Sequence, residues 1–177
     1  MAGADPEQHR QQWQRQLAEG LHAQQLELTE AQQGQLIDYL SLLYKWNRAY
    51  NLTAVRDPGE MVSRQLLDSL SILGWIEGPR VLDVGTGAGL PGLVLAIARP
   101  ELDFTLLDAN GKKIRFIRQA IMELGLQNVQ AQQQRIEQFQ PGEPFDTITS
   151  RAFAELKDFV DLTGHLIRPG GQWLAMK

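Results

Sequence analysis

Apolar residues recur at helical spacing through the first third of the chain, separated by polar and often glutamine-rich stretches. A narrow apolar stripe with a spacing of four predicts an amphipathic helix over residues 7–24. Broader stripes predict a second helix, begun by a capping box of Thr29 and Gln32, and a third after the turn at residues 57–59. These stripes are Trp13, Leu17 and Leu21; Leu36, Ile37, Leu40, Leu43 and Tyr44; and Val62, Leu66, Leu67, Leu70 and Leu73. We therefore expect residues 1–78 to form a helical segment.

After residue 78 short apolar runs begin to alternate with helical periodicity. Four such runs predict strands, a fifth and more polar segment at Asn128–Gln133 is a weaker strand signal, and the segments between them predict helices. The expected strands are Arg80–Val84, Leu102–Asp108, Asn128–Gln133, Phe145–Thr149 and Gln172–Met176, the last after a turn at Pro169-Gly170-Gly171; the expected helices are residues 91–98, Lys112–Leu124 and Leu156–Ile167. This alternation indicates a doubly wound, Rossmann-like α/β domain over residues 79–177, whose ligands bind at the carboxyl ends of the strands. Because the fifth strand would leave an exposed edge, we also expect that the domain lacks its last strands in this sequence.

Composition narrows the classes of protein. With 43% hydrophobic and 21% charged residues, the chain resembles a soluble globular protein, and no apolar window is long enough to span a membrane. The N-terminus lacks the pattern of a secretory signal, so we expect a cytoplasmic protein. There is no cysteine, and His9, His22 and His165 are scattered, so we expect no metal site. A net charge of −4 argues against general coating of nucleic acid but leaves room for a local basic patch.

The glycine-rich loop from Asp83 to Gly92 fits two classes of cofactor. Gly87-x-Gly89-x-x-Gly92, with Asp108 placed 21 residues after Gly87, matches a dinucleotide fingerprint, so an NAD-dependent oxidoreductase is an alternative. A pyrophosphate, however, needs free N–H groups at the helix N-terminus, and the carboxylate of Asp83 would repel it. S-adenosylmethionine has no phosphate and carries a sulfonium and an ammonium group, which suit that carboxylate. We therefore favour a methyltransferase, in which Gly87 gives the ligand room and Asp108 accepts hydrogen bonds from the ribose hydroxyls.

Four separated motifs resemble the bacterial ribosomal RNA small-subunit methyltransferase G family. They are Trp46–Thr53, Arg64–Leu70, Asp83–Gly92 and Ser150–Phe153. The resemblance extends from about Leu28 to Lys177 and implies S-adenosylmethionine-dependent methylation of guanine N7 in small-subunit (16S) ribosomal RNA. The family pattern usually has histidine where this chain has Gln65, so no role for that imidazole is carried over.

The same resemblance implies further cofactor contacts. They are Gly85 and Leu90 in the loop, Ile136 and Glu137 after the third strand, and Arg151 after the fourth. The positions of these residues after parallel strands agree with the expected ligand edge, where an apolar side chain can cover an adenine face. Each position also has a plainer interpretation, as a loop residue or as a surface ion pair.

For RNA, the sequence offers a basic surface and two aromatic residues. The cations are Lys112, Lys113, Arg115 and Arg118, with Arg48, Arg56 and Arg64 from the helical segment. Trp46 and Tyr50 could stack on bases, although packing against the protein is the commoner fate of such residues. Methyl transfer to guanine N7 needs no general base, so we assign no catalytic acid or base. A small-molecule methyltransferase and a non-catalytic cofactor-binding module remain alternatives.

Overall fold

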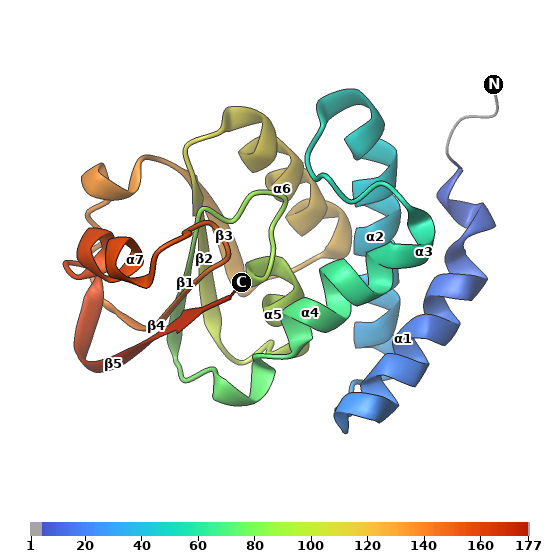
Figure 1. The fold of residues 1–177 in the computed structure, drawn as a ribbon, viewed down its shortest axis with the longest axis horizontal. Helices are drawn as coiled ribbons and strands as arrows, with labels where there is room; N and C mark the ends of the chain where they lie inside the picture. Colours follow the sequence, from blue (N-terminus) through green and yellow to red (C-terminus); the bar gives the residue numbers. More distant parts are fainter. Residues whose placement is uncertain (1–4, 177) are drawn as a thin grey trace.

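The computed structural model describes residues 5–176 and contains a five-stranded sheet with helices on both faces (Figure 1). The strands are β1 (Arg80–Val84), β2 (Asp103–Asp108), β3 (Val129–Gln133), β4 (Phe145–Ser150) and β5 (Ile167–Ala175). The helices are η1 (Pro6–Gln8), α1 (Arg10–Gln24), α2 (Glu30–Tyr50), α3 (Pro58–Met61), η2 (Val62–Leu67), α4 (Asp68–Leu70), η3 (Leu73–Trp75), α5 (Gly92–Ala98), α6 (Gly111–Leu124), η4 (Ile136–Gln138) and α7 (Leu156–Thr163). Every strand pair is parallel and the order is β3-β2-β1-β4-β5, which confirms the predicted doubly wound α/β class.

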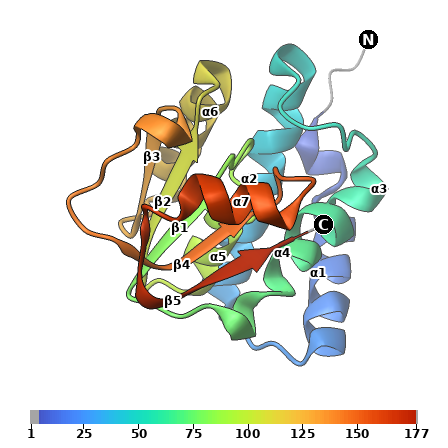
Figure 2. The ribbon, with the colours of Figure 1, turned by 60° about the vertical axis from the view of Figure 1, so that its left-hand side comes forward.

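Most of the helices cover one face of the sheet. α5 packs on β2, α6 packs on β2 and β3, and α2 contacts both α5 and α6. α7 lies on the opposite face, with β5 and η4 as its neighbours (Figures 1 and 2). The larger hydrophobic cluster joins the N-terminal helices to α5 and α6, so the helical segment and the sheet share one core.

The three expected N-terminal helices are present. The apolar stripe of the first is buried in α1, and the predicted capping box of Thr29 and Gln32 begins α2. The third is a continuous helical stretch of α3, the π-helical η2 and α4. Its Leu67 packs so closely on α1 that a Cβ atom on Gly20 would lie 2.2 Å from Leu67 Cδ1. Within residues 5–176, no helix has both the length and the apolar character that crossing a membrane requires.

The boundary between the last helix and the last strand differs from the prediction. α7 ends at Thr163, not at Ile167, and β5 begins at Ile167, before the expected turn at residues 169–171. The cause is strand register, because Ile167 pairs with Phe145 on β4. The residues that follow Ile167 form a β-bulge. Gly170, with φ of +83°, makes this irregularity possible.

β2 and β3 carry polar residues on a part of the second face that the described helices leave uncovered. Only the short η4 connects β3 to β4, so none of the helices within residues 5–176 covers this end of the second face. Thr105, Gln130 and Gln132 line a polar hollow there. The polarity of β3, which is unusual for a parallel strand, is therefore the solvent-facing composition of an uncovered edge.

Tyr39 of α2 connects the helical segment to the glycine-rich loop. Its hydroxyl is buried and donates a hydrogen bond of 2.8 Å to the carbonyl oxygen of Ala88. We expect Tyr39→Phe to lower the free energy of unfolding by about 1 kcal/mol, because the Ala88 carbonyl loses its buried partner. Urea denaturation measures this loss. The control is Tyr44→Phe, since no hydrogen bond from the Tyr44 hydroxyl is present among residues 5–176; an equal loss in both variants would contradict the prediction.

Candidate functional site

The loop after β1 folds around one buried carboxylate. Asp83 Oδ2 accepts hydrogen bonds from the hydroxyl of Thr86, at 2.7 Å, and from the backbone N–H of Gly92, at 2.8 Å. The side chain is completely buried, and this desolvation raises the pKa of Asp83 to about 7, against the opposing effects of both hydrogen bonds and of Arg151. Oδ1 is also buried and has no hydrogen-bond partner among the described residues.

Two glycines of this loop have different physical roles. A Cβ atom on Gly92 would lie 2.7 Å from the Asp83 carboxylate and 2.8 Å from Leu106, so glycine is required for α5 to pack on the sheet. Gly87 has φ of +60°, and a Cβ atom there would meet no atom within 4 Å. Gly92 therefore serves the packing of the helix, whereas Gly87 borders open space.

The same contacts argue against a pyrophosphate at this loop. A dinucleotide phosphate would need the free N–H groups at the N-terminus of α5. The N–H of Gly92, the first residue of α5, already donates a hydrogen bond to Asp83. The carboxylate of Asp83 therefore takes the position that a phosphate would need at this helix N-terminus. The glycine spacing is thus explained without a nucleotide phosphate.

A cavity of about 250 Å³ opens at the carboxyl ends of β1, β2 and β3. Its walls are mainly apolar, and carboxylates lie at its border. It is lined by Val84, Gly85, Leu107, Asp108, Ala109, Gln134, Arg135, Ile136, Glu137, Ala152 and Phe153. Such a largely apolar hollow with a few polar groups is the usual form of a small-molecule site.

Asp108 is held in a fixed orientation at this cavity. Its Oδ2 accepts from the N–H of Gly87 and its Oδ1 from the N–H of Asn110, both at 2.8 Å. Each carboxylate oxygen can accept a second hydrogen bond, so Asp108 retains capacity for ligand hydroxyls.

The structure brings together half of the residues that the sequence proposed. Gly85, Asp108, Ile136 and Glu137 all line the cavity. Gly87 adjoins it through its bond to Asp108, whereas Asp83, Leu90 and Arg151 are absent from the lining. Sequence reasoning did not single out Val84, Leu107, Ala109 and Gln134, although each ends or follows a parallel strand and this position could have identified them.

A family comparison and two relatives bear on what this site binds. The model of the family described as rRNA small subunit methyltransferase G matches residues 32–177. The Chromohalobacter salexigens protein named ribosomal RNA small subunit methyltransferase G is 59% identical over 158 residues, or 89% of this chain and 76% of that protein. The protein of the same name from Marinobacter nauticus is 57% identical, over 94% of this chain and 78% of that protein.

The chain belongs to the rRNA small subunit methyltransferase G family.

Two solved methyltransferase structures have a fold similar to that of this chain. A SAM-dependent methyltransferase from Thiobacillus denitrificans, in complex with S-adenosylhomocysteine, aligns with a TM-score of 0.55 at 19% identity, covering 73% of this chain and 53% of that one. Coclaurine N-methyltransferase, bound to N-methylheliamine and S-adenosylhomocysteine, also gives 0.55, at 17% identity over 96% and 57% of the two chains. At these identities the likeness shows the fold.

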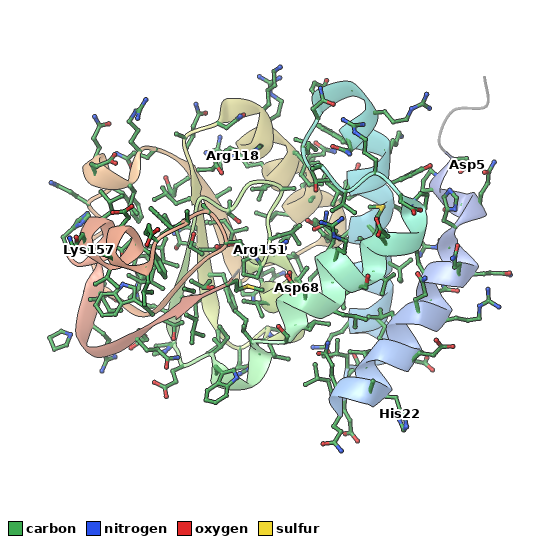
Figure 3. All side chains as sticks on the ribbon, viewed as in Figure 1. Asp5, His22, Asp68, Arg118, Arg151 and Lys157 are labelled. Atoms are coloured by element: carbon green, nitrogen blue, oxygen red, sulfur yellow. The ribbon has the colours of Figure 1, made fainter. Side chains whose placement is uncertain are left out.

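In this member of the methyltransferase G family, Arg151 lies between the sheet and α4. Its Nη2 approaches Asp68 Oδ2 at 3.8 Å, and the two side chains face each other near the centre of the molecule (Figure 3). Arg151 Nη1 is buried without a hydrogen-bond partner among residues 5–176, as is Asp83 Oδ1. Two buried polar atoms of opposite character thus have no hydrogen-bond partner within the described residues.

Gln65 stands where the resemblance to the family led us to expect a histidine. Its side chain is buried, and Nε2 donates a hydrogen bond of 2.8 Å to the hydroxyl of Thr53. Gln65 therefore connects η2 to the loop that follows α2.

We predict that Asp83→Asn changes how stability depends on pH. Asparagine keeps one acceptor for Thr86 and Gly92 and removes the buried charge. Between about pH 4 and pH 7, folded wild-type protein keeps a proton that the unfolded chain has lost, because the pKa of Asp83 is raised to about 7. The wild-type free energy of unfolding should therefore fall as pH rises, by up to about 1.4 kcal/mol per pH unit, and the variant should lack this contribution.

Urea denaturation at about pH 5 and pH 8 measures the difference. Asp103→Asn, at an exposed carboxylate at the start of β2, is the matched control and should retain the wild-type trend. The same trend in all three proteins would show that Asp83 is ionised at both pH values.

Proposed function

We propose that this chain transfers a methyl group from S-adenosylmethionine to guanine N7 of small-subunit (16S) ribosomal RNA, in the cytoplasm, where ribosomal subunits form. The observation that carries the proposal is the cavity at the strand ends, in a chain 59% identical to a protein named ribosomal RNA small subunit methyltransferase G. Asp83, Gly85, Gly87, Leu90, Asp108, Ile136, Glu137 and Arg151 are its proposed cofactor residues.

The residues present fit this cofactor. Ile136, Leu107 and Phe153 supply apolar walls for a planar adenine, and the carboxylate of Asp108 can accept from ribose hydroxyls. The buried Asp83 Oδ1 has no hydrogen-bond partner within residues 5–176, and a ligand with positive charge suits it. We propose that Leu90, which is buried in the core, acts by shaping the loop, and that Arg151 acts where the cofactor and the substrate meet.

The chemistry demands positioning more than proton transfer. When bound, S-adenosylmethionine supplies a methyl group activated by its sulfonium. Guanine N7 carries a lone pair and no hydrogen, so an in-line displacement needs no general base. The task of the chain is to orient the two reactants and exclude water; Phe153 and Ile136 give the cavity an apolar wall, and Arg151 offers a guanidinium to the guanine or its phosphate.

We retain the proposed division into a helical segment, residues 1–78, and a cofactor-binding domain, residues 79–177. The helical segment supplies Asp68 opposite Arg151 and Tyr39 beneath the loop. These contacts support a role in shaping the substrate side of the site.

Methyl incorporation separates this proposal from the alternatives. Small ribosomal subunits that lack the modification are incubated with protein and methyl-labelled cofactor, and labelled nucleosides are then analysed. N7-methylguanosine in small-subunit RNA supports the proposal. Label in small molecules alone would indicate another substrate class, and cofactor binding without transfer would indicate a binding module.

A prediction for Gly87 tests the cofactor site against a matched glycine. Gly87 and Gly125 have φ of +60° and +66°, and a Cβ atom on either would meet nothing within 4 Å. Gly87→Ala and Gly125→Ala should therefore lose similar stability, about 1 kcal/mol, from the left-handed backbone. Only Gly87→Ala should also weaken binding of S-adenosylhomocysteine, by tenfold or more, since its Cβ atom enters the ligand space. Calorimetry measures binding; equal affinities of both variants would remove Gly87 from the site.

A second prediction concerns Arg151. Lysine keeps the positive charge but lacks the planar fork of the guanidinium. Arg151→Lys should therefore reduce methylation of small-subunit RNA more than tenfold, equivalent to over about 1.4 kcal/mol, with an unchanged melting temperature. Near-normal turnover in Arg151→Lys would leave only a requirement for charge, and near-normal turnover in Arg151→Ala would exclude Arg151 from the site.

A further inference from the structure

Two segments at the ligand edge contain seven cations and no acidic residue. They are residues 44–56, at the end of α2 and in the loop after it, and residues 109–122, which include most of α6. The cations are Lys45, Arg48, Arg56, Lys112, Lys113, Arg115 and Arg118. Since the whole chain has a net charge of −4, positive charge is concentrated on these segments.

These seven cations also lack the ion pairs found elsewhere in the protein. Within residues 5–176, none of them lies within 4 Å of a carboxylate oxygen. The paired cations are Arg10, Arg64, Arg80, Arg99, Arg151, Lys157 and Arg168. The two segments therefore keep their positive charge available for an anionic partner.

Three aromatic rings in contact join the two segments. The ring of Trp46 on α2 packs against Phe116 on α6, with centroids 5.6 Å apart, and Tyr50 packs on Trp46 at 5.3 Å. Tyr50 is the outermost ring, with 39% of its surface exposed. The end of α2 and the start of α6 lie side by side at the top of the molecule (Figures 1 and 2).

This surface adjoins the candidate site. Asp108 and Ala109 line the cavity, and the chain continues from them directly into the first turn of α6. A polymer bound along the cations could therefore bring one of its bases next to a cofactor held in the cavity.

We propose that the seven cations and Tyr50, here called the basic edge, bind a single-stranded stretch of RNA. The cations contact phosphates, and the ring of Tyr50 stacks on an unpaired base. A duplex would satisfy the cations but would leave no base free for Tyr50, and base–aromatic stacking is the usual device for unpaired nucleotides. This inference rests on the proposed function, because it names the form of RNA that the site receives.

Fluorescence anisotropy with a short labelled single-stranded RNA, and with a hairpin of the same composition, tests the basic edge. Tyr50→Ala should weaken binding of the single strand roughly tenfold, whereas Tyr50→Phe should bind as the wild type does. The double variant K112Q/R115Q should reduce the slope of log K against log salt by about 1.4, or roughly 0.7 for each phosphate that the variant no longer neutralises. The control is Arg15→Gln on α1, an exposed cation that also lacks an ion pair within residues 5–176 and should leave the slope unchanged.

Three results would overturn the inference. They are wild-type affinity in Tyr50→Ala, an equal change of slope in Arg15→Gln, and preference for the hairpin over the single strand. Failure of the proposed function would give a different result, in which the wild-type protein binds S-adenosylhomocysteine but does not methylate small-subunit RNA. If the wild type methylates that RNA while the variants bind RNA normally, the basic edge is wrong and the function stands.

Discussion

The buried carboxylate of Asp83 is the constraint on which the site depends. Removing a carboxylate from water is costly, and the protein offsets this cost with hydrogen bonds from Thr86 and Gly92. These bonds join the end of β1, the turn and the first residue of α5 into one unit. Because Gly92 must lie against both Asp83 and Leu106, the path of the loop over the sheet has little freedom.

The position of Asp83 also decides where a ligand can lie. Because the N-terminus of α5 faces a carboxylate, an anionic group of a ligand cannot bind at that end of the helix. The open space lies instead toward Asp108, which is itself fixed by the N–H of Gly87. Gly92 thus allows the helix to pack, and Gly87 orients the carboxylate of Asp108. The same short loop therefore determines both the packing of the fold and the shape of the cavity.

Much of the fold was predictable because local pattern determines it. The strands β1, β2 and β4 and the helices α1, α2 and α6 follow apolar periodicity and caps that lie within each segment. The start of β5 was not predictable, because Ile167 joins the sheet through its register with Phe145, a pairing between distant residues. In the site, the end of a parallel strand indicated Asp108, and the family resemblance indicated Gly85, Ile136 and Glu137; all four line one cavity. No local pattern indicated that Arg151 faces Asp68, since that approach depends on how α4 packs beside the sheet.

The short connection between β3 and β4 explains two features that look unrelated in the sequence. A full helix there would cover the second face at β2 and β3 and would require apolar residues on it. With only η4 in this connection, Gln130 and Gln132 remain on an uncovered face, and the sequence of β3 is polar. The same brevity places Ile136, the first residue of η4, at the strand ends, where it forms a wall of the cavity. The weakness of β3 as a sequence signal and the presence of an apolar ligand wall thus have one structural cause.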